Sequence, residues 1–194
     1  MVNLNSVCVF CGSKNGYNPA YEASAKRLGE IMAERKITLV YGGGRIGLMG
    51  IVADAILAGG GKVIGIIPDF LKELEVGHDT VTEQIVTNSM HERKHRMFEL
   101  SDGFVVLPGG LGTLDETLEI MTWKQLRLHS KPIVVLNIGG YWSALAELVR
   151  ATIDGGFAHP AVSELYTMVD SADDVFSALV NQPKPKEEVL TSHL

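Results

Sequence analysis

The residues of this sequence best suited to chemistry form a glycine-rich run that ends in two acids, Pro108–Glu116 (PGGLGTLDE). An apolar segment precedes the run and a long segment with helical spacing follows it, which predicts a strand, a tight loop and a helix. Backbone amides at a helix start can hold a phosphate, and Thr113 can cap the helix and offer a hydroxyl. Acids beside a phosphate cradle are electrostatically unusual unless one takes part in the reaction. Glu116 is therefore a candidate catalytic residue.

A second glycine-rich run, Gly42–Gly50 (GGGRIGLMG), contains the GxGxxG pattern between a predicted strand and a predicted helix. This context favours contact with a phosphate or nucleotide, with Gly43 and Gly44 as candidate ligands. The alternative is a turn whose glycines let a helix and a strand pack closely. A nicotinamide dinucleotide is disfavoured, because the pattern follows the second strand and only Asp69 is placed to bind a ribose.

The run Met90–Arg96 (MHERKHR) is the dense basic cluster of the chain. It contains HExxH, which can bind zinc, but no convincing third ligand follows, so no metal site is predicted. A solvated helix face is the ordinary alternative. Because the cluster precedes the strand that leads into the PGGLGT loop, Arg93 and Lys94 are candidate ligands for a phosphate or ribose.

A third motif, Cys8–Cys11 (CVFC), has CxxC spacing but begins inside a predicted strand. Redox pairs of this kind usually start a helix, so we interpret Cys8 as a core residue. Ser13 follows the strand end, where a ligand can touch it.

Short apolar segments alternate with helical ones along the chain, and this pattern must position these residues. Strands that are apolar throughout are buried on both faces, which predicts one doubly wound, Rossmann-like parallel sheet of about six or seven strands flanked by helices. Residues 1–181 are predicted to form this single domain, and residues 182–194 a flexible tail. Strands are expected at Ser6–Phe10, Ile37–Tyr41, Lys62–Ile67, Gln84–Thr87, Gly103–Leu107, Pro132–Asn137 and Tyr166–Val169. Helices are expected at Tyr21–Glu34, Leu48–Ala58, Ser89 to about Leu100, Thr113 to about Leu128, Trp142–Asp154 and Ala172–Leu179. In the third of these, Ser89 is expected to be the N-cap, with Glu92 completing a capping box.

Composition excludes several classes of protein. The 194 residues are 46% hydrophobic and 21% charged, which is typical of a globular domain and excludes intrinsic disorder. Seventeen basic and 23 acidic residues give a net charge of −6, which argues against nucleic acid as the main partner. We find no apolar run long enough for a membrane span and no signal peptide, and we expect a cytoplasmic protein.

Taken together, these motifs resemble the LOG (Lonely Guy) family of cytokinin riboside 5′-monophosphate phosphoribohydrolases, members of which often carry a lysine decarboxylase label. The resemblance rests on the two glycine-rich runs, on CVFCGS at Cys8–Ser13, on the M-H-x-R-K run at Met90–Lys94 and on T-W-x-Q-L at Thr122–Leu126. It extends over about residues 6–157.

The resemblance implies hydrolysis of the N-glycosidic bond of an N6-modified adenosine 5′-monophosphate, which yields the free base and ribose 5-phosphate. It implies no cofactor, a homodimer, and Arg93 and Glu116 as the catalytic pair. The nucleotide-binding residues that it implies are Glu75, Arg93, Lys94, Gly109, Gly110, Leu111, Gly112, Thr113, Leu114, Asp115 and Thr122.

The implied roles agree with the chemistry of N-glycosides. Cleavage passes through a state with positive charge on the ribose, which a carboxylate such as Glu116 can stabilise while it orients water. An apolar slot is needed for the N6 group, and Met90, Met97, Met121 and Trp123 are candidates by position. A general purine monophosphate nucleosidase and a non-catalytic nucleotide-binding module remain as alternatives.

Overall fold

The protein is built around one parallel sheet of seven strands in the computed structural model, which describes residues 4–72 and 77–183. The strand order is β4-β3-β2-β1-β5-β6-β7, so the α/β prediction is confirmed. The strands are β1 (Ser6–Phe10), β2 (Thr38–Tyr41), β3 (Val63–Pro68), β4 (Glu83–Thr87), β5 (Gly103–Val106), β6 (Ile133–Leu136) and β7 (Thr167–Val169).

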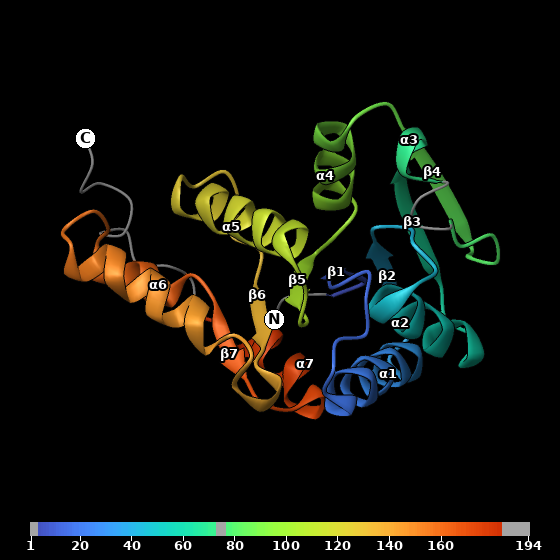
Figure 1. Cartoon of the computed structure of the whole chain (residues 1–194), viewed down its shortest axis with the longest axis horizontal. Coiled ribbons are helices and arrows are strands. Elements are labelled where there is room, and N and C mark those ends of the chain that lie inside the picture. The colour runs from blue at the N-terminus through green and yellow to red at the C-terminus, as the bar shows by residue number, and fades with distance from the viewer. Residues whose placement is uncertain (1–3, 73–76, 184–194) are drawn as a thin grey trace.

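Helices cover both faces of the sheet (Figure 1), as continuous apolar strands require. One layer holds α1 (Pro19–Glu34), α2 (Gly47–Ala58) and α7 (Val175–Asn181), and the other holds α4 (Met90–Glu99), α5 (Leu111–Gln125) and α6 (Ser143–Asp154). Short helical segments are α3 (Asp69–Lys72), η1 (Ile138–Gly140), η2 (Pro160–Glu164) and η3 (Ala172–Asp174). Each layer packs its own apolar cluster against the sheet.

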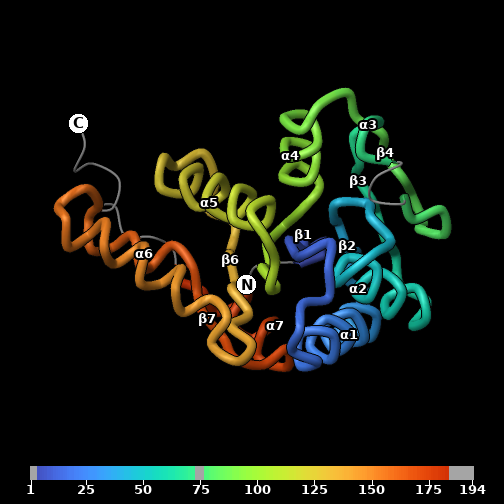
Figure 2. The backbone as a smooth tube through the Cα atoms, in the orientation of Figure 1, coloured from blue at the N-terminus to red at the C-terminus, as the bar shows by residue number. Residues whose placement is uncertain are grey.

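The strand order reverses direction between β1 and β5. From β1 the chain builds outward to β4 and then returns to pair β5 with the free edge of β1, a path that Figure 2 traces in colour. The loops after these two strands meet, because the amide of Gly12 donates to the carbonyl of Pro108 at 3.0 Å. In sheets of this kind ligands bind in the crevice at such a reversal.

Two helix starts differ from the sequence prediction. Helix α5 begins at Leu111 with Gly110 at the N-cap, so Thr113 is the third helical residue and does not cap the helix. In α4, Ser89 caps as predicted, accepting from the amide of Glu92 at 3.1 Å. The returning carboxylate of Glu92 accepts instead from the amide of Asn88, one residue earlier than in a standard capping box.

At the end of the strands opposite to the crevice, the Gln182 side chain bonds to strand β6 and helix α5. Its amide group exchanges hydrogen bonds with the backbone of Ile133, at 2.9 and 3.0 Å, and accepts one from the buried ammonium of Lys124. The predicted tail starts at this residue, and its remaining part from 184 onward lies outside the described residues.

Candidate functional site

The start of helix α5 is open, with backbone amides that no side chain caps. Helices α1 and α4 are capped by the side chains of Asn18 and Ser89, whereas Gly110 offers none. A Cβ atom added to Gly110 or Gly112 would meet no atom within 4 Å. These glycines therefore border space rather than packed protein, and the amides of the first turn are available to an anion.

The start of helix α2, which carries the GxGxxG pattern, is filled by the protein itself. The amide of Leu48 donates to the carbonyl of Gly12 at 3.1 Å. Gly47 has a φ of +67°, and a Cβ atom there would lie 2.2 Å from the carbonyl carbon of Ser13. This helix start therefore holds the loop after β1, and the packing interpretation of the run Gly42–Gly50 accounts for it.

The predicted ligands Gly43 and Gly44 are engaged with another part of the chain. Gly43 accepts a hydrogen bond from the amide of His78 at 3.1 Å, and Gly44 forms a bridge with Gly77. Neither residue lines a cavity described below. Of the three consecutive glycines, only Gly42 borders the site.

A cavity of about 260 Å³, here called the reaction cavity, lies where the loops after β1 and β5 meet helices α4 and α5. Arg93 and Glu116 both line it, so the structure brings the implied catalytic pair to one place. Its other polar or backbone lining comes from Cys11, Gly12, Ser13, Gly42, Gly110, Leu111, Gly112 and Thr113.

Arg93 is held rigidly beneath this cavity. Its side chain is only 4% exposed, and its Nε and Nη2 atoms donate to the carbonyls of Ile66 at 3.1 Å and Gly42 at 2.8 Å. A Cβ atom at Gly42 would come within 2.1 Å of Nη2, so only glycine leaves room for the guanidinium. The ends of two strands thus fix the cation in position.

Glu116 lies in the second turn of α5, with 9% of its surface exposed at the cavity. A buried carboxylate close to the reacting bond is suited to stabilise positive charge and to orient water. Burial and then the charge of Glu116 raise the pKa of the nearby Cys8 thiol well above its ordinary value. Cys8 is fully buried, as predicted, and is inert as a nucleophile in this setting.

One wall of the reaction cavity is apolar. Met90 and Met97 from α4 contribute to it as predicted, and Met49 and Leu71 join them. The other two predicted residues lie elsewhere: Met121 is in the core, and the ring of Trp123 packs edge-on against Phe98. Methionine suits a wall that must adapt to a variable apolar group.

Lys94 and Asp115 meet each other rather than the cavity. The ammonium of Lys94 lies 3.1 Å from Asp115 and 3.2 Å from Glu119, which ties α4 to α5. Burial alone lowers the pKa of Lys94, but the bonds to these two carboxylates outweigh it and raise that pKa. Neither Lys94 nor Asp115 lines either cavity described here.

The remaining predicted residues fall in three places. Leu114 packs against the apolar cluster under α5, and Thr122 is exposed with its hydroxyl bonded to the carbonyl of Leu118 at 2.7 Å. Glu75 lies outside the described residues. Gly109 lines a second cavity.

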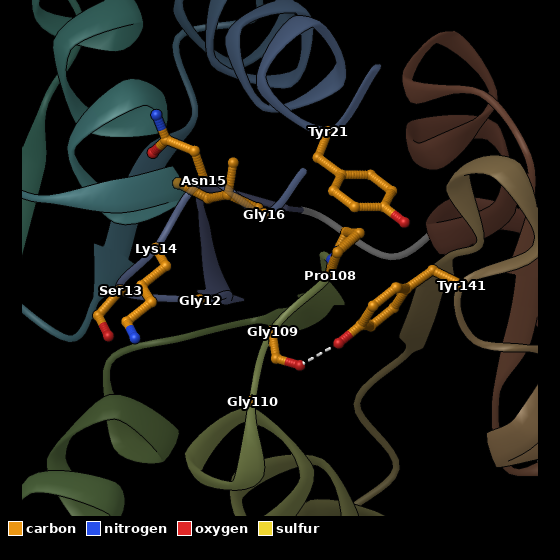
Figure 3. Close-up of a pocket in the computed structure, with 11 residues that line it drawn as sticks. Gly12, Ser13, Lys14, Asn15, Gly16, Tyr21, Pro108, Gly109, Gly110 and Tyr141 are labelled. Atoms are coloured by element: carbon orange, nitrogen blue, oxygen red, sulfur yellow. Dashed lines mark hydrogen bonds between the residues drawn. The ribbon is translucent and has the colours of Figure 1, made fainter. Parts of the chain in front are cut away.

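This second cavity, whose lining residues Figure 3 shows, is here called the tyrosine cavity. It has a volume of about 380 Å³ and adjoins the first. The two share Gly12, Ser13 and Gly110. Its own walls carry Lys14, Asn15, Tyr21 and Tyr141. Sequence reasoning did not single out these four residues, because none of them belongs to a motif that it used. The available signals were the position of Lys14 and Asn15 just after the CVFCGS run and that of Tyr141 just after a glycine pair, whereas Tyr21 gave no signal beyond its place at the start of a predicted helix.

The HExxH histidines do not gather metal ligands. His95 pairs with Glu99 at 3.2 Å on the exposed side of α4. Within residues 4–72 and 77–183, no three His, Cys, Asp or Glu side chains are grouped as metal ligands would be. No helix in the same residues has the length and apolar character needed to cross a membrane.

Comparison with known proteins adds sequence relatives over nearly the whole chain. The family model described as "Possible lysine decarboxylase" matches residues 49–179. The cytokinin riboside 5′-monophosphate phosphoribohydrolase LOG7 of Arabidopsis thaliana is 40% identical over 97% of this chain and 86% of its own length. The probable cytokinin riboside 5′-monophosphate phosphoribohydrolase LOGL9 of Oryza sativa subsp. japonica is 46% identical over 89% of this chain and 76% of its own length.

Solved structures share the fold at lower identity. The molybdenum cofactor binding protein of Rippkaea orientalis superposes with a TM-score of 0.69 at 21% identity, covering 91% of this chain and 96% of that one. The molybdenum cofactor carrier protein of Chlamydomonas reinhardtii gives a TM-score of 0.67 at 20% identity, covering 93% of this chain and 98% of that one. At this identity the likeness establishes the architecture and nothing of the ligand.

Proposed function

Because this chain belongs to the LOG family, we propose that it hydrolyses the N-glycosidic bond of N6-modified adenosine 5′-monophosphates, releasing the free base and ribose 5-phosphate. The observation that carries the proposal is the joint placement of Arg93 and Glu116 in one cavity with an open helix start and a methionine wall. Each part of the substrate has a matching part of the cavity. The anion faces backbone amides, the reacting sugar faces Glu116, and the apolar N6 group faces Met49, Met90 and Met97.

Glu116 is the residue that acts at the reacting carbon. As the bond from C1′ to the base nitrogen breaks, positive charge grows on the sugar, and the carboxylate stabilises it. Glu116 also orients a water whose oxygen bonds to C1′, while the proton that the water loses ends on the departing base. A positioned carboxylate in this role contributes roughly 10²- to 10⁴-fold in rate.

Arg93 holds the substrate in register with Glu116. Its Nε and Nη2 atoms are engaged by backbone carbonyls, so the group cannot swing away when the cavity is empty. A fixed cation binds phosphate or sugar oxygens without losing side-chain entropy at that moment. No lysine lines the reaction cavity in the described part of the chain, which gives the lysine decarboxylase description of the family model no support here.

The test is to incubate the purified protein separately with isopentenyladenosine 5′-monophosphate and with AMP, and to quantify base and ribose 5-phosphate by chromatography. We expect base release from the modified nucleotide, with Glu116→Gln lowering kcat about 10³-fold. Glu119→Gln is the matched control, because Glu119 lies one turn further along α5 and bonds to Lys94 outside the cavity. Equal loss in both variants would remove Glu116 from the reaction.

Arg93 needs two variants, since Arg93→Ala leaves two buried carbonyls without their donor and also weakens the fold. Arg93→Lys keeps a positive charge but not the planar fork. We expect both to lose activity, and Arg93→Lys to stay folded. Faster cleavage of AMP than of the modified nucleotide would favour a general nucleosidase, and tight binding of both without cleavage a binding module.

We also propose that the protein acts as a homodimer through the exposed face of α5. Leu118, Thr122 and Leu126 recur every four residues on this face, and both leucines are exposed. Family resemblance gives Thr122 a nucleotide contact, yet in one chain it lies outside both cavities, so a second copy would have to bring it to a site. Light scattering should report twice the chain mass for the native protein and a monomer for Leu118→Glu.

A further inference from the structure

The tyrosine cavity has no role in the bond cleavage described above, although it shares a rim with the reaction cavity. That rim consists of Gly12 and Ser13 from the loop after β1 and Gly110 from the loop after β5. Whatever binds between the two loops therefore faces both cavities.

The rim is rich in unused hydrogen-bond donors. Within the described residues, the backbone amides of Ser13, Lys14, Gly109 and Gly110 donate no hydrogen bond. The amide of Gly12, by contrast, is used to join the two loops. Backbone amides without an acceptor, on two loops that meet, can bind an anion that lies between the loops.

Lys14 adds a full positive charge to this rim. Its side chain is exposed and forms no hydrogen bond or ion pair with any described residue. In Figure 3 the side chains of Ser13 and Lys14 extend in the same direction from the loop. This differs from Lys94, whose ammonium is already paired with two carboxylates.

Tyr141 fixes the orientation of the loop after β5. Its hydroxyl donates to the carbonyl of Gly109 at 2.5 Å, the dashed line in Figure 3, and its ring packs against that of Tyr21 with centroids 5.5 Å apart. In a trans peptide the carbonyl and the following amide point in opposite directions. By holding the Gly109 carbonyl, Tyr141 therefore turns the amide of Gly110 to the other side of the peptide.

We propose that this rim binds the terminal oxygens of a phosphomonoester dianion. Lys14 is its specificity-determining cation, and Tyr141 is a positioning residue that acts through the Gly110 amide. The inference rests on the proposed function for the identity of the ligand, a nucleoside 5′-monophosphate. It assigns the discrimination between nucleotide and nucleoside to Lys14 and Tyr141, outside the glycine-rich motif and apart from Arg93.

The experiment measures binding of AMP by calorimetry, and of adenosine by competition, in a Glu116→Gln background where turnover is suppressed. We expect Lys14→Met to weaken AMP binding about tenfold and Tyr141→Phe about fivefold, as loss of a charged and of a neutral hydrogen bond predicts. Adenosine binding should stay within about twofold in both, since neither residue contacts the nucleoside. The AMP affinity of Lys14→Met should also depend less on salt concentration.

Two matched controls accompany these variants. Tyr21→Phe removes the other phenol of the cavity, whose hydroxyl bonds to no described residue, and Lys26→Met removes an exposed lysine of α1 that lines neither cavity. Both should bind AMP as the background protein does. Equal weakening of AMP and adenosine, or unchanged AMP binding in Lys14→Met and Tyr141→Phe, would overturn the proposal.

The outcome is separable from that of the proposed function. If the native chain cleaves no nucleotide but its AMP affinity depends on Lys14 and Tyr141, hydrolysis is wrong and the phosphate rim stands. If the native chain cleaves the modified nucleotide while these variants keep full AMP affinity, the hydrolase stands and the rim is wrong.

Discussion

The two glycine-rich loops of this protein have nearly the same composition and opposite surroundings. In Gly42–Gly50, a Cβ atom would lie about 2 Å from Arg93 at Gly42, from Ser13 at Gly47, and from Arg45 of the same loop at Gly50. In Pro108–Glu116, a Cβ atom at Gly110 or Gly112 would meet nothing within 4 Å. The first loop therefore uses glycine to pack protein against protein, and the second leaves space for a ligand.

This difference teaches that a glycine motif gives the position of a close approach but not the partner. Both loops join a parallel strand to a helix without a side-chain cap, so both satisfy the usual criteria for a phosphate loop. The two loops differ in whether the protein itself already occupies the backbone amides at the helix start. The carbonyl of Gly12 already takes the Leu48 amide at the start of α2, while the first turn of α5 faces the reaction cavity.

Substitution of Gly47 by alanine should have the largest effect on stability. The residue has a φ of +67°, and its new methyl group would overlap the backbone of Ser13 and Lys14, which cannot move without shifting the loop after β1. We expect a loss of about 4 kcal/mol in the free energy of unfolding, measured with urea.

Gly60→Ala is the control for the φ angle alone, since Gly60 has a φ of +73° and no neighbour within 4 Å. It should lose about 1 kcal/mol. Equal losses at Gly47 and Gly60 would show that the first loop is not tightly packed.

Gly42→Ala should produce a smaller loss of stability together with a loss of activity. Its methyl group would displace the end of Arg93, a flexible side chain, and break the 2.8 Å bond from Nη2 to the Gly42 carbonyl. We expect about 2 kcal/mol of destabilisation and turnover reduced to the level of Arg93→Lys. Turnover at the native rate would mean that Arg93 acts from some other position.

Gly112→Ala should have the smallest effect on stability, and it should stabilise the fold rather than destabilise it. The residue is in the first turn of α5 with open space beside it, so alanine should raise the free energy of unfolding by about 0.5 kcal/mol. The same methyl group intrudes on the reaction cavity, and KM for the monophosphate should rise about tenfold. An unchanged KM would show that substrate does not approach this turn.

The sequence was sufficient to predict the sheet, because each central strand is an uninterrupted apolar segment bounded by glycine, proline or polar residues. It also predicted that Arg93 and Glu116 lie near the loop after β5, and both line one cavity there. It could not tell that Lys94 would pair with Asp115 and Glu119, nor that Gly43 would bond to His78, because such contacts join segments distant along the chain. The start of α5 was misplaced by two residues because Thr113 resembles a cap, whereas glycine at the true cap provides no side-chain signal.

The reversal of strand order between β1 and β5 also has a consequence for how the chain folds during synthesis. Val7 pairs with Gly103, 96 residues later, whereas β1 to β4 pair with their neighbours in chain order. The first four strands can therefore associate while the edge of β1 remains exposed, and contacts that span so many residues form slowly. The crevice that holds Glu116 closes only when β5 and α5 dock on that edge, so a stalled chain would present an aggregation-prone strand in place of an active site.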